Sequence, residues 1–140
     1  VVVPGAIILL VSGAWLTIEF FDGWNFVSIP WLAGMAFLFV FEFVEGNTVT
    51  RIYFMRLRRL TQEALRVGAF TPELEKARAE NIPTFTHFLD LPILFLIVTL
   101  GALKPNSWEL FIVGSLIAVV FAAALTIFIP RLYPWDANHK

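Results

Sequence analysis

Four long stretches of the chain are apolar and nearly free of charge, and polar segments separate them. The apolar stretches cover residues 1–20, 26–45, 83–103 and 108–130. Each is close to the roughly 20 residues that a helix needs to cross a hydrocarbon core about 30 Å thick. None alternates between apolar and polar positions as a barrel strand does, and a helix satisfies its backbone hydrogen bonds within one segment. The pattern predicts an all-α transmembrane bundle with four visible spans, forming a single domain over residues 1–140.

The connection between the second and third spans, residues 46–82, is polar and long enough to hold its own helices. Its first half repeats apolar residues at steps of three and four beside basic ones, which is typical of an amphipathic helix. Gly68 is suited to end that helix. Thr71, Pro72 and Glu73 then provide the cap and first turn of a second one. We therefore expect a helix, a break and another helix here.

Composition excludes several classes of protein. Of the 140 residues 59% are hydrophobic and 15% are charged, whereas a soluble domain carries about 25% charge. These charges are too few to coat a soluble fold, so lipid must solvate the remainder. The net charge of -1 provides no basic excess for nucleic acid. The absence of cysteine excludes disulfides and thiolate metal sites.

Basic residues are concentrated in the 46–82 connection, which holds most of those in the chain. They are Arg51, Arg56, Arg58, Arg59, Arg66, Lys76 and Arg78. The positive-inside rule makes this connection cytoplasmic and, by alternation of the spans, places the C-terminal tail on the same side. The five arginines could contact anionic lipid headgroups. Alternatively, they serve only to set the topology.

Ionisable residues in and beside the third span are the candidates for chemistry. His87 and Asp90 share one face of that helix, being three residues apart. Glu42 and Glu45 leave the second span on the same side of the membrane, so the four groups are expected to converge. Together they could bind a divalent metal or relay protons, and His87 could ligate haem iron if a second ligand came from elsewhere. The alternative is that they sit in the headgroup region and pair locally.

The fourth span carries small residues every four positions. They are Gly114, Ala118, Ala122 and Thr126. Such a ridge lets another helix approach closely. The spacing does not show whether that helix belongs to this chain or to another subunit.

Several segments resemble a family of bacterial predicted integral membrane proteins, domain of unknown function 2269. The likeness lies in residues 1–15 (VVVPGAIILLVSGAW), Trp31-Leu32, residues 56–60 (RLRRL) and Lys104-Pro105. A more distant similarity is to the copper-resistance D membrane domain. The resemblance implies a multi-pass protein of the bacterial cytoplasmic (inner) membrane. It also implies one further helix upstream, which would make five spans. It supplies no activity and therefore no catalytic residue.

Three functions follow as hypotheses. The first is a non-catalytic subunit or assembly factor of a larger membrane complex, for example one for electron transfer, with lipids and other membrane subunits as partners. The second is a haem- or metal-binding redox protein that uses His87. The third is a small proton-coupled transporter built around Glu42, Glu45, His87 and Asp90.

Overall fold

The computed structural model describes residues 2–21 and 23–132, and this part of the chain is helical without strands. The C-terminal tail from residue 133, for which a cytoplasmic location was predicted from the positive-inside rule, lies outside the described residues. The elements are α1 (Val2–Phe20), η1 (Gly23–Ser28), α2 (Pro30–Glu45), η2 (Gly46–Thr50), α3 (Arg51–Val67), α4 (Pro72–Arg78), α5 (Asn81–Leu103) and α6 (Glu109–Leu132). The predicted all-α class is confirmed.

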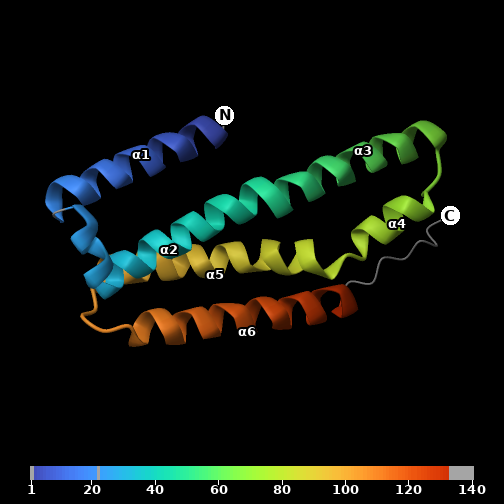
Figure 1. The fold of residues 1–140 in the computed structure, drawn as a ribbon. Coiled ribbons are helices and arrows are strands. Elements are labelled where there is room, and N and C mark those ends of the chain that lie inside the picture. Colours follow the sequence, from blue (N-terminus) through green and yellow to red (C-terminus); the bar gives the residue numbers. More distant parts are fainter. Residues whose placement is uncertain (1, 22, 133–140) are drawn as a thin grey trace.

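The second span and the start of the 46–82 connection form one uninterrupted helix. Helix α2 passes through η2, a turn of π-helix, directly into α3, and the whole segment is helical from Pro30 to Val67. At 1.5 Å per residue its 38 residues extend for about 57 Å. Figure 1 shows α3 continuing beyond the helices packed beside α2. The predicted amphipathic helix is therefore an extension of the second span.

The break after α3 follows the predicted local chemistry. Gly68 ends the helix with a positive φ of 72°, a conformation that glycine adopts without a Cβ penalty. Thr71 then caps α4 by accepting a hydrogen bond at its side chain from the Leu74 backbone N–H, and Pro72 takes the first helical position. Leu74 and Ala77 are buried where α4 folds back on α3. We call this pair of helices the α3–α4 hairpin.

Replacing Thr71 with alanine is expected to destabilise α4 by about 0.5–1 kcal/mol, because it removes the side-chain acceptor of the cap and leaves the Leu74 N–H only the Thr71 backbone carbonyl, to which it also donates. Hydrogen exchange of the α4 amides would report the loss as faster exchange. Thr99→Ala provides the control, since the Thr99 hydroxyl bonds to a carbonyl of its own helix, Phe95 O. Equal exchange of α4 in the two variants would contradict the prediction.

The bundle core lies where α5 packs between α2 and α6. The buried side chains of this core are Leu38, Leu89, Ile93, Leu96, Leu100, Ala118 and Ala122. Gly34, Gly101 and Gly114 bring the helices close, because a Cβ at any of them would press on a neighbouring side chain. Close approach through small residues is how helices pack in lipid, where burial of apolar surface contributes little.

Three described helices are long and apolar enough to cross a membrane: the continuous Pro30–Val67, Asn81–Leu103 and Glu109–Leu132. A shorter apolar segment, Ile7–Phe20, lies in α1. The four-span count is therefore not confirmed by this criterion. Helix α1 packs appreciably only against η1, and it stands apart from the bundle in Figure 1. None of its described side chains is buried.

Candidate functional site

The antiparallel packing of α2 against α5 brings Glu42 and Glu45 to the level of His87 and Asp90. The register is set where Gly34 of α2 lies against Leu100 of α5. Counting eleven residues onward along α2 and eleven back along α5 places Glu45 opposite Leu89, next to Asp90. The carboxyl groups of Glu42, Glu45 and Asp90 lie close enough together that a charge on one affects the others. We refer to Glu42, Glu45, His87 and Asp90 as the carboxylate–imidazole cluster.

Glu45 is the most enclosed member of the cluster, with only 8% of its surface exposed. Its Oε1 accepts a hydrogen bond of 2.7 Å from the Thr50 hydroxyl, five residues further along the chain. Thr50 is the last residue of η2, the π-helical turn that follows Glu45, and π-turns of this kind are frequent at functional sites. Its Oε2 is buried without a hydrogen-bond partner among the described residues.

His87 and Asp90 form the more open side of the cluster. His87 Nδ1 lies 3.6 Å from Asp90 Oδ2, and both side chains are partly exposed. The imidazole and Phe54 rings also pack in a T-shaped arrangement, with centroids 5.6 Å apart. A histidine oriented by a carboxylate is the arrangement found behind many metal-ligating imidazoles.

The cluster does not provide a complete metal site by itself. In residues 2–21 and 23–132 no group of three or more His, Asp or Glu side chains has the geometry to hold a metal ion. His139, the second histidine of the chain, lies outside the described residues. A metal or haem held by His87 would need further ligands that this part of the chain does not bring to it.

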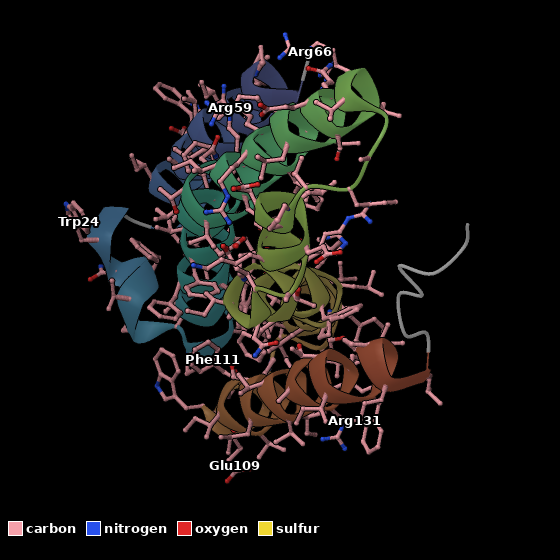
Figure 2. The ribbon with its side chains drawn as sticks, turned by 90° about the vertical axis from the view of Figure 1, so that its right-hand side faces the viewer. Trp24, Arg59, Arg66, Glu109, Phe111 and Arg131 are labelled. Atoms are coloured by element: carbon pink, nitrogen blue, oxygen red, sulfur yellow. The ribbon has the colours of Figure 1, made fainter. Side chains whose placement is uncertain are left out.

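The five arginines predicted to contact lipid lie along α3. Arg56 pairs with Glu80 at the start of α5 and so ties the α3–α4 hairpin to the bundle. The other four are exposed, and Figure 2 shows Arg59 and Arg66 on the outer surface of α3. Along the helix axis Arg66 lies about 22 Å beyond Arg51.

The small-residue ridge of α6 packs within the chain. A Cβ at Gly114 would collide with the Leu96 side chain of α5, and Ala118 and Ala122 are buried in the same contact. Thr126 turns its hydroxyl to the Ala122 carbonyl of its own helix. The ridge therefore provides the α5–α6 interface, a choice that the spacing had left open.

An open cavity of about 560 Å³ lies between the first turns of α5 and the end of α6, and sequence reasoning had missed it. Its lining is mainly apolar, with Asn81, Thr126 and Arg131 as the polar members. No periodic signal in the sequence marks it, because its lining comes from two helices that are far apart along the chain.

Comparison with known proteins identifies a family for this chain. Residues 1–105, three quarters of the chain, match a family described as predicted integral membrane protein, domain of unknown function 2269. No curated protein and no solved structure matches the chain.

Proposed function

The chain belongs to this family of predicted integral membrane proteins. From that membership and the packing of α1, we propose that it is a non-catalytic subunit or assembly factor of a larger membrane complex. In that complex α1 docks against a membrane-spanning helix of a partner protein. A single observation carries the proposal. The bundle of α2, α5 and α6 uses its small residues for internal packing, whereas α1 packs appreciably only on η1.

Glycines provide the sharpest contrast between α1 and the rest of the bundle. At Gly34, Gly101 and Gly114 the space that a Cβ would fill is already occupied by a neighbouring helix. At Gly5 and Gly13 of α1 nothing lies within 4 Å. Helices associate in lipid through faces of small residues that allow close backbone approach. Gly13 leaves such a space between Leu9 and Thr17 on its face of α1, and no helix of the described chain fills it.

Photo-cross-linking in native membranes tests the proposal. At 100° per residue, Leu9 lies on the same face of α1 as Gly13, whereas Val11 lies on the opposite face. A photoreactive residue at Leu9 is expected to give one discrete adduct with another membrane protein, and the same residue at Val11 is expected to give none. Val120, exposed on α6, serves as a second control. Native mass after gentle solubilisation should show the same partner.

Two results would overturn the proposal. A monomeric particle that carries only lipid, with no adduct from Leu9, would remove the partner altogether. An adduct of the chain with a second copy of itself would make the protein a homo-oligomer and not a subunit of a mixed complex.

A haem- or metal-binding role is the second candidate, favoured by the His87–Asp90 pair. A carboxylate that orients one ring nitrogen leaves the other, Nε2, to face a ligand. An absorption spectrum and a metal analysis of the purified full chain test this role directly. A haem band that disappears in His87→Ala would support it, and a protein without haem or bound metal would exclude it.

Proton-coupled transport is the third candidate and uses the same cluster. The groups lie toward one end of the spans, whereas transporters typically place their sites near the midplane, between structural repeats. Proton flux into proteoliposomes that is the same for Asp90→Asn and the natural sequence would count against it.

A further inference from the structure

We propose that Glu45 is a proton-binding site within the membrane, which exchanges its proton through Asp90 and His87 with the side of the membrane on which α3 begins. The proposal does not depend on the partner of α1. It rests on the depth of Glu45, on the unpartnered oxygen of its side chain, and on the groups that surround it.

The depth of Glu45 follows from a pair of residues at the opposite end of the bundle. The Lys104 ammonium lies 5.5 Å from the centre of the Trp31 ring, and tryptophan and lysine are typical of the headgroup layer. With that pair as one boundary, Glu45 lies about 21 Å along α2 from Trp31, and Asp90 lies about 21 Å along α5 from Lys104. Both distances fall within a hydrocarbon core of about 30 Å.

The carboxylate of Glu45 has too few partners to remain charged at that depth. Thr50 donates one hydrogen bond to Oε1, and Oε2 has no donor among the described residues. A buried charge without a counter-ion costs more than the loss of its proton does, so such a group takes up a proton. The two ion pairs of the neighbouring segments, Arg56–Glu80 and His87–Asp90, do not include Glu45.

The elements packed against Glu45 supply like charges and one imidazole. Helix α2 contributes Glu42, and α5 contributes Asp90 and His87. The side chains of η2 are neutral, and Arg51 at the start of α3 is exposed and has no ion pair in the described part of the chain. Helix α6 has no titratable residue between Glu109 and Arg131.

The same groups provide a route for the proton. His87 lies about 26 Å along α5 from Lys104. It is therefore closer than Asp90 to the edge of the hydrocarbon core opposite the Trp31–Lys104 pair. Both side chains are partly exposed, while Glu45 is enclosed. A proton taken up by His87 can pass by way of bridging water to Asp90 and then to Oε2 of Glu45, and it leaves by the reverse steps. His87 Nδ1 lies 3.6 Å from Asp90 Oδ2, and Oε2 of Glu45 has no hydrogen-bond partner among the described residues, so each step moves one proton and needs a water between the two groups.

Infrared difference spectroscopy of the full chain in lipid vesicles tests the site. At neutral pH we expect the carbonyl stretch of a protonated carboxyl group, with the small downshift in D₂O that identifies an exchangeable acid. Uniform labelling with ¹³C-glutamate should move the band, which assigns it to glutamate rather than aspartate without any substitution. Glu45→Gln should abolish it, whereas Glu63→Gln, which alters an exposed carboxylate on α3, should leave it unchanged.

Glu42→Gln keeps the proposal testable if Glu45→Gln fails to fold. A band that persists in Glu42→Gln and shifts with labelled glutamate assigns the proton to Glu45, and a band lost only in Glu42→Gln overturns the assignment. The absence of any protonated carboxyl at neutral pH overturns the proposal, as does a carboxylate band that shifts with added Na⁺ or Mg²⁺, which would mark a cation site instead.

Discussion

Replacing Leu100 with alanine is expected to destabilise the bundle by about 2–3 kcal/mol. Leu100 is a fully buried residue of α5 that faces α2. Its Cδ1 lies 3.5 Å from the position that a Cβ would take at Gly34 of α2. Large-to-small core substitutions typically cost about 2–5 kcal/mol. The lower half of that range applies here, because lipid is as apolar as the core and the loss is mainly of packing contacts around a cavity.

A reversible unfolding titration in mixed micelles would measure this free energy. Leu91→Ala is the matched control, since it makes the same change on the same helix at a side chain that is 73% exposed. The control should fall within about 0.5 kcal/mol of the natural sequence, as surface substitutions usually do. If both variants lost the same stability, α5 would not be packed against α2 through Leu100.

Much of the fold could be predicted from where charge is absent. The apolar runs end near Phe20, Glu45, Leu103 and Leu132, where the helices end or change character. The turn at Gly68 was also predictable, because a left-handed C-cap and a threonine cap are local chemistry that neighbouring helices do not override.

The continuity of α2 into α3 could not be predicted in the same way. The segment Gly46-Asn47-Thr48 has the composition of a break. In the structure its side chains bond back to the preceding turn: Asn47 Nδ2 donates to Phe43 O, and the Thr48 hydroxyl donates to Val44 O. These bonds, with the π-turn, extend the helix. Composition alone does not show whether such side chains end a helix or support it.

The burial of Glu45 depends on tertiary packing that the sequence does not encode locally. A glutamate at the end of an apolar run is typical of the headgroup layer. The sequence therefore also allowed the alternative that the cluster lies in the headgroup region and pairs locally. Glu45 is enclosed because α5 and η2 both lie against the end of α2. The register between α2 and α5, which follows from Gly34 and Gly101, decides which carboxylates meet. A single sequence shows which face of each helix is apolar, but it does not show which helices pack together or in what register.

The sequence likewise does not show which glycines lie against a neighbouring helix. In the structure Gly114 of α6 does, and Gly13 of α1 does not. Replacing Gly114 with leucine is expected to destabilise the bundle by about 3 kcal/mol. Even a Cβ there would collide with Leu96, which is itself buried and has little room to move. Unfolding in mixed micelles would report the loss as a lower midpoint, and an unchanged midpoint would mean that α5 and α6 are further apart than described.

Gly13→Leu is the matched change on α1, and it separates packing within the chain from packing against a partner. Nothing lies within 4 Å of a Cβ at Gly13, so the purified chain should change by less than about 1 kcal/mol, through helix propensity alone. In native membranes the same leucine should block close approach of a partner helix and remove the adduct formed from Leu9. A variant that kept its adduct would show that the partner does not use the Gly13 face. A purified variant that lost stability would place a helix of this chain on that face.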